Sequence, residues 1–120
     1  MPTRVLIADD SELVRGIIRR FLEMKRDVEV CAETGDGQET IDAAMALSPD
    51  LLILDVVMPR LNGIAVASIL KKSLPKTKTI VFTMYGDYVK NVALAAGVNV
   101  VVSKPDGICA LLQAVEALLT

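Results

Sequence analysis

Three carboxylates, one hydroxyl and one ammonium stand directly after apolar runs of this sequence. Asp9 and Asp10 follow the first run, Asp55 follows the third, and Thr83 and Lys104 follow the fourth and fifth. Carboxylate oxygens suit Mg²⁺, a hard cation that keeps several waters and binds through a few carboxylates plus a phosphate. An ionised aspartate is also a nucleophile that forms an aspartyl phosphate. These residues together predict a magnesium-dependent phosphoryl transfer.

Each group has a distinct role in such a reaction. Asp55 is the predicted phosphoacceptor, the metal and Lys104 each neutralise one phosphoryl oxygen, and the Thr83 hydroxyl donates to another. No general base is needed because the nucleophile is already ionised. Singly, each feature has a structural explanation, since an Asp pair often caps a helix and a lone lysine is usually a surface charge. The combination is what predicts a site.

Five short apolar runs alternate with five amphipathic stretches, a pattern typical of repeated βα units. Right-handed crossovers predict an α/β fold with a doubly wound, parallel five-stranded sheet in the order 2-1-3-4-5. In this order the first and third strands are neighbours. Ligands bind at the carboxyl ends of the strands in such sheets, so the three carboxylates are expected to converge there.

Helical periodicity assigns the faces of the helices. The first helix is expected to be capped by Asp10 or Ser11 and to expose Arg15, Arg19, Arg20 and Glu23 to solvent. The second is expected to bury Ile41, Ala44 and Met45. The residues expected to be buried in the first helix are Leu13, Val14, Ile17, Ile18, Phe21 and Leu22.

Composition limits the classes of function. The 120 residues fit one domain, 1–120, after which any output domain would follow; 52% are hydrophobic, only 3% are aromatic, and the net charge is −2. This balance argues against direct nucleic-acid binding, which favours basic patches and stacking aromatics. The lack of histidine excludes a phosphohistidine donor and His-dependent nucleophiles.

Nothing in the sequence indicates a membrane or secreted protein. No apolar run reaches the roughly 18 residues that span a bilayer, and the first strand pattern begins too early for a signal peptide. Cys31 and Cys109 are interpreted as reduced core thiols. The expected location is therefore cytoplasmic.

Several motifs carry a family resemblance along almost the whole chain: VLIADDS (5–11), DLLILDVVMP (50–59) followed by Gly63, IVFT (80–83), AGV (96–98) and SKP (103–105). With them the chain resembles the receiver domains of two-component response regulators, signalling domains that catalyse only their own phosphorylation and dephosphorylation. The resemblance implies a flavodoxin-like three-layer sandwich and a sensor histidine kinase as phosphoryl donor. Its opening block is most similar to receivers of transcription factors with a helix-turn-helix, DNA-binding output domain.

The resemblance also implies a ligand set and a readout face. Asp10 and Asp55 would bind Mg²⁺ directly and Asp9 through water, and the backbone carbonyl of Val57 would complete the set. The Lys104–Pro105 bond would be cis. Phosphorylation would switch the face formed by the fourth helix, fifth strand and fifth helix, through which homodimers can form.

Four positions depart from the family pattern. Met84 replaces a small residue after the switch threonine, and Val101 replaces the aromatic side chain that swings inward. We therefore expect the readout to use Tyr85 or Tyr88; the alternative is that these tyrosines only cover the edge of the core. In the family the positions of Val57 and Tyr85 line the path of the hydrolytic water; these bulky side chains would orient it poorly, which predicts slow dephosphorylation.

Three alternatives compete with an active receiver. A haloacid-dehalogenase-like phosphatase would need a second carboxylate at Val57. A flavodoxin-like FMN carrier would need a glycine-rich phosphate loop where Asp9 and Asp10 stand. A stand-alone or degenerate receiver that only binds proteins ranks lower, because all the charged site residues are present.

Overall fold

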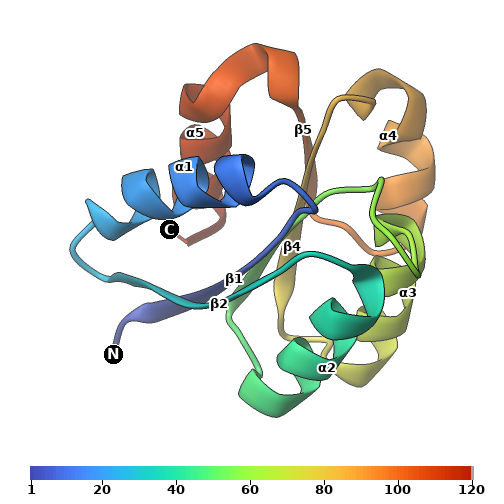
Figure 1. Ribbon diagram of the computed structural model, residues 1–120, viewed down its shortest axis with the longest axis horizontal. Helices are drawn as coiled ribbons and strands as arrows, with labels where there is room; N and C mark the ends of the chain where they lie inside the picture. The colour runs from blue at the N-terminus through green and yellow to red at the C-terminus, as the bar shows by residue number, and fades with distance from the viewer. Residues whose placement is uncertain (120) are drawn as a thin grey trace.

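The computed structural model describes residues 1–119, in which strands and helices alternate (Figure 1). The strands are β1 (Thr3–Ala8), β2 (Val28–Thr34), β3 (Leu51–Leu54), β4 (Lys78–Thr83) and β5 (Val100–Ser103). The helices are α1 (Glu12–Glu23), α2 (Gly37–Leu47), α3 (Gly63–Ser73), α4 (Gly86–Ala95) and α5 (Gly107–Leu119), with a 3-10 turn at Lys104–Asp106. Thr120 lies outside the described residues.

The strands form one parallel sheet in the order β2-β1-β3-β4-β5, which confirms the predicted topology. β3 is central, and its four residues are at most 1% exposed because helices cover both faces. The register pairs Ala8 with Leu54. The residues that follow them, Asp9 and Asp55, therefore leave the sheet side by side.

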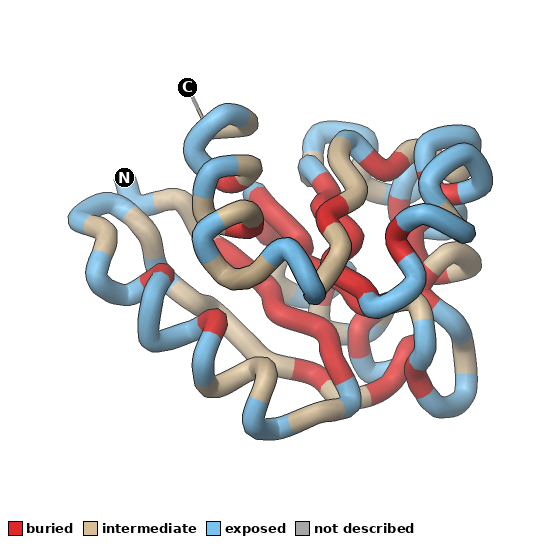
Figure 2. Tube along the Cα trace, turned by 90° about the horizontal axis from the view of Figure 1, so that it is seen from above, coloured by how far each residue is buried: buried red, intermediate tan, exposed pale blue. Residues whose placement is uncertain are grey.

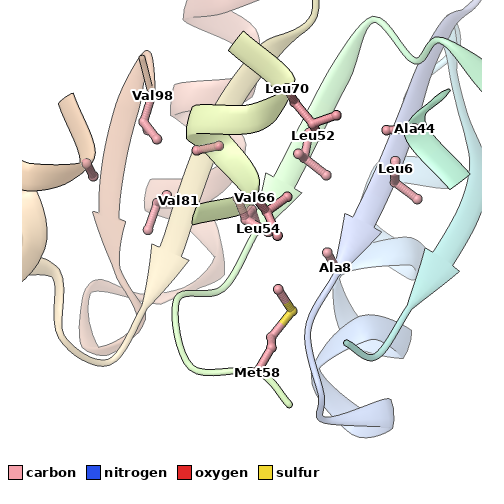
Figure 3. Packing of buried hydrophobic residues seen from close by; sticks show 12 residues of the cluster. Leu6, Ala8, Ala44, Leu52, Leu54, Met58, Val66, Leu70, Val81 and Val98 are labelled. Atoms are coloured by element: carbon pink, nitrogen blue, oxygen red, sulfur yellow. The ribbon is translucent and has the colours of Figure 1, made fainter. Parts of the chain in front are cut away.

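Side chains of the strands alternate between two separate cores. Leu6 and Leu52 face one core with α2, α3 and α4, whereas Val5 and Leu51 face the other with α1 and α5. Figure 3 shows Val66 and Leu70 of α3 lying against β3 in the first core. The sheet with these two helical layers forms the expected three-layer sandwich.

α1 buries a narrower stripe than its sequence predicts. Ile18 and Leu22 are fully buried, but Leu13, Ile17 and Phe21 are 74%, 40% and 39% exposed. A helix on the flank of a sheet contacts it along one line, so apolar residues beside that line stay accessible. Figure 2 shows the same contrast between buried strands and the exposed turns of the outer helices.

Two further expectations about burial were wrong. Met45 on α2 is 52% exposed, because Ala44 and the half-buried Ile41 already fill the space beneath the helix. Cys109 is exposed at the start of α5, whereas Cys31 is half-buried and donates its thiol to the Val5 carbonyl at 3.4 Å. Only Cys31 therefore resembles the expected core thiol.

Two local backbone features were predicted, the cap of α1 and a cis Lys104–Pro105 bond, and only the first is confirmed. The Ser11 hydroxyl accepts a hydrogen bond from the Val14 N–H at 3.2 Å, which confirms Ser11 as the cap of α1. The Lys104–Pro105 bond was expected to be cis but is trans, as are all peptide bonds of residues 1–119. Here the chain turns directly from β5 into the 3-10 turn.

None of the helices in the described part of the chain is long and apolar enough to cross a membrane.

Candidate functional site

Three acidic side chains converge beyond the carboxyl ends of β1 and β3. Asp9 and Asp55 are 2% and 7% exposed, and Asp10 is exposed to solvent. One carboxylate oxygen of each lies within 4.8 Å of the others. The adjacent register of β1 and β3 produces this cluster, as the sequence predicted.

Lys104 connects the two buried carboxylates. Its Nζ lies 2.8 Å from Asp9 Oδ2 and 2.9 Å from Asp55 Oδ2. The lysine follows β5, two strands away from β3, and its side chain crosses the end of the sheet to reach them. The structure thus brings the predicted lysine and the three predicted carboxylates together.

Backbone amides hold the remaining carboxylate oxygens. Asp9 Oδ1 accepts the Ser11 N–H at 2.9 Å, and Asp55 Oδ1 accepts the Val56 N–H at 2.7 Å. The Val56 carbonyl in turn accepts the Gly63 N–H at 2.8 Å. A Cβ on Gly63 would lie 2.0 Å from the main-chain oxygen of Asp55, so only glycine permits this close return of the loop.

Burial and charge shift the pKa of two site groups. Burial is the main cause that raises the pKa of Asp9 above its usual 3.8, against the opposing effect of Lys104. Burial by itself would lower the pKa of Lys104, but hydrogen bonds and charges from Asp9 and Asp55 outweigh it and hold the pKa above 10.5. The Lys104 ammonium is therefore charged at neutral pH. Its charge and hydrogen bond do not fully offset the cost of burying the ionised Asp9 carboxylate.

The donor set fits a hard divalent cation. Three carboxylates against one ammonium leave a formal charge of −2 among these four side chains, which one Mg²⁺ would balance. Oxygen ligands without sulfur or imidazole favour magnesium or calcium over softer metals. The residues present therefore suit the cation that the sequence predicted.

Thr83 lies at the end of β4, beside the cluster but not bonded to it. It is fully buried, and its hydroxyl oxygen accepts the Tyr85 N–H at 3.3 Å. Within residues 1–119 no hydrogen bond joins Thr83 to Asp55. The Thr83 hydroxyl oxygen thus accepts a hydrogen bond from α4's N-terminal segment, and its proton can still be donated to another group.

The residues expected in the readout lie on two sides of Thr83. Met84 and Tyr85 are 60% and 51% exposed at the start of α4, and Tyr88 is 87% exposed one turn later. Val101 of β5 is half-buried and packs on the core that α4 covers. At Gly86 a Cβ would lie 2.1 Å from Ser103 Oγ, so the start of α4 rests directly on the end of β5.

Val57 lies in the loop that follows Asp55. Its side chain is 54% exposed and lines an open groove between this loop, α3 and α4. The branched side chain carries no polar group. Val57 and Tyr85 are the two positions from which slow dephosphorylation was predicted.

The sequence reasoning missed Arg15, which was assigned to the solvated face of α1. Its side chain is only 18% exposed, and its Nη1 donates to the main-chain carbonyl of Asp9 at 2.6 Å. Its Nε lies 3.2 Å from Glu33 on β2. One signal was available, because the helix dipole disfavours a cation near the start of a helix, and a nearby anion or carbonyl would offset this.

Comparison with known proteins identifies similar sequences. The family model of the response regulator receiver domain matches residues 5–116. The transcriptional regulatory protein LiaR of Bacillus subtilis is 40% identical over 84 residues, 70% of this chain and 40% of LiaR. The response regulator protein VraR of Staphylococcus saprophyticus is 36% identical over 85 residues, 71% of this chain and 41% of VraR. The chain thus spans less than half the length of these relatives.

Solved structures of similar sequence share the fold. A LuxR-family two-component response regulator from Aurantimonas superimposes with a TM-score of 0.92 at 28% identity, covering 99% of this chain and 86% of that one. The isolated receiver domain of RcsB from Salmonella enterica, solved with the phosphomimetic BeF₃⁻, gives 0.90 at 29% identity, with 99% and 89% covered. Their likeness extends over almost the whole chain.

Proposed function

Since the chain belongs to the response regulator receiver domain family, we propose that it accepts a phosphoryl group on Asp55 in a magnesium-dependent reaction. One observation carries the proposal: Lys104 bonds two buried carboxylates, Asp9 and Asp55, and the exposed Asp10 carboxylate stands beside them. A buried acidic cluster with a single fixed ammonium is costly to fold. Phosphoryl transfer at this cluster would account for that cost.

The chain's own residues perform the positioning that the transfer needs. One oxygen of the ionised Asp55 carboxylate attacks phosphorus, the bond from phosphorus to the donor breaks, and the donor leaves with its electron pair. The Val56 N–H holds the carboxylate in place. Lys104 moves from carboxylate to phosphoryl oxygen, where its charge offsets the transferred charge.

Asp9, Asp10, Asp55 and the backbone carbonyl of Val57 would hold Mg²⁺. When bound, the cation supplies positive charge that neutralises phosphoryl oxygens. We assign Asp9 to the outer part of this set, where Lys104 and the Ser11 N–H contact its oxygens. Asp10 is suited to direct contact because its carboxylate is exposed.

Thr83 connects the transfer to a readout. A phosphoryl group on Asp55 would attract the Thr83 hydroxyl, which now accepts the Tyr85 N–H. Moving it would release the start of α4 and favour one of two pre-existing arrangements of the α4-β5-α5 face. Val101 supplies no aromatic ring to this motion, so Met84, Tyr85 and Tyr88 would carry the change in exposed surface.

We assign a sensor histidine kinase as donor and a second copy of this chain as a partner of the α4-β5-α5 face. The similarity to LiaR and VraR supports a DNA-binding output domain in the parent protein. The receiver itself, with its net charge of −2, would not contact DNA.

Incubation with acetyl phosphate tests the proposal. With Mg²⁺ present, intact-mass analysis should show one added phosphoryl group on the wild type and none on Asp55→Asn. Asp50→Asn is the matched control, because Asp50 lies at the opposite end of β3, and it should be modified normally. Modification that persists in Asp55→Asn, or without any divalent cation, would refute the assignment. A wild type that is never modified would favour a degenerate binding module.

A further inference from the structure

Asp10 is the carboxylate of the cluster whose position is least restrained. Lys104 and backbone amides fix the carboxylates of Asp9 and Asp55. The Asp10 side chain makes no hydrogen bond or ion pair with any residue in 1–119. Its carboxylate can therefore be placed only by the backbone that carries it, and above all by the peptide unit that joins it to Asp9.

Arg15 holds that peptide unit. The carbonyl of the Asp9–Asp10 peptide accepts the Arg15 Nη1 at 2.6 Å, while the Asp9 N–H donates to the Thr34 carbonyl at 3.0 Å. These two bonds fix the peptide planes on both sides of Asp9. The direction in which the chain carries Asp10 away from the sheet thus depends on a side chain one turn inside α1.

Glu33 fixes Arg15 in turn. The carboxylate of Glu33 on β2 binds Arg15 Nε at 3.2 Å and also pairs with Arg19 one turn further along α1. Arg15 and Glu33 are only 18% and 20% exposed. A planar guanidinium suits this arrangement because it can serve a carboxylate and a carbonyl at once, which a lysine ammonium matches poorly.

From this geometry we infer that Arg15 is a positioning residue for Mg²⁺ binding, acting through the Asp9–Asp10 peptide on the Asp10 carboxylate. The inference rests on the proposed function of the acidic cluster. The positioning role also predicts the direction in which Arg15 changes the affinity for Mg²⁺. A cation near an anionic site weakens metal binding by repulsion, so a purely electrostatic Arg15 would inhibit Mg²⁺ binding. A positioning Arg15 promotes it.

Calorimetric Mg²⁺ titration of matched variants tests the inference. Arg15→Gln should weaken Mg²⁺ affinity about tenfold, as expected for the loss of a group that orients a metal ligand. Arg19→Gln is the control, because Arg19 shares the helix, the charge and the partner Glu33 but makes no contact with Asp9. It should bind Mg²⁺ like the wild type. Unchanged or tighter binding by Arg15→Gln would overturn the inference.

A double-mutant cycle distinguishes positioning from a general loss of stability. In an Asp10→Asn background, Arg15→Gln should weaken Mg²⁺ binding little further, because the ligand through which it acts is gone. A full additional loss would mean that Arg15 acts by another route. Arg15→Lys, which retains the charge, should still bind weakly and serves as a second variant if Arg15→Gln unfolds. A wild type that binds no Mg²⁺ would instead refute the proposed function itself.

Discussion

Replacing Lys104 with methionine should destabilise the fold strongly in the absence of divalent cations. The ammonium lies 2.8 Å from Asp9 and 2.9 Å from Asp55. At an effective dielectric constant near 20, a 2.8 Å contact represents about 6 kcal/mol of attraction. Desolvation offsets much of this, and breaking a buried pair typically costs about 3–5 kcal/mol. Because Lys104 is 16% exposed, we expect a loss of about 2–4 kcal/mol in the free energy of unfolding.

The loss should depend on pH and on Mg²⁺. Burial already raises the pKa of Asp9 above 3.8, and removal of the ammonium would raise it further. A carboxyl with a raised folded-state pKa favours folding when protonated, so the loss should be small in acid and grow as pH rises through that pKa. Added Mg²⁺ should recover part of the lost stability by binding the folded state.

Urea unfolding followed by far-UV circular dichroism measures the effect in chelator, at neutral and mildly acidic pH. Lys25→Met is the control, since Lys25 forms a 2.7 Å pair with an exposed partner, Glu116. Its unfolding midpoint should remain near that of the wild type. If Lys104→Met and Lys25→Met behave alike at both values of pH, the electrostatic account of the cluster is incorrect.

Three further outcomes are expected. Leu70→Ala, at a residue that is 2% exposed, should lose about 2–5 kcal/mol in thermal or urea unfolding, whereas Ile69→Ala, at 42% exposure, should lose far less. A thiol reagent followed by mass spectrometry should label exposed Cys109 before Cys31, whose pKa is raised by burial; labelling in the reverse order would contradict the burial. Val57→Asn should change the decay of the phosphorylated protein, measured by intact mass over time, and an unaltered rate would show that this side chain does not control water.

The sequence predicted the sheet and the cluster because both follow from order along the chain. Continuous apolar runs identify buried strands, and crossover handedness then limits the strand order, so Asp9, Asp10 and Asp55 had to meet. Periodicity was less informative about helix faces. It locates the centre of a buried stripe, such as Ile18 and Leu22, but its width depends on the neighbouring elements.

The sequence did not predict which partners the long side chains of Lys104 and Arg15 contact. Lys104 was expected at the site, but its simultaneous contact with two carboxylates depends on how its flexible chain crosses the sheet end. Arg15 was assigned to solvent because its spacing matches the outer face of α1. The carbonyl that it binds belongs to a loop, whose path no periodic pattern describes.

The division of the interior into two cores has a consequence for how a signal can travel. Ala93 of α4 packs in one core, and Leu111 and Val115 of α5 pack in the other. β5 contributes Val101 to the first and Val102 to the second. Because α4 and α5 both contact β4 and β5, these two strands separate the two cores at this edge of the sheet. A rearrangement that moves α4 and α5 in concert would therefore pass through the backbones of β4 and β5, whose successive side chains enter opposite cores.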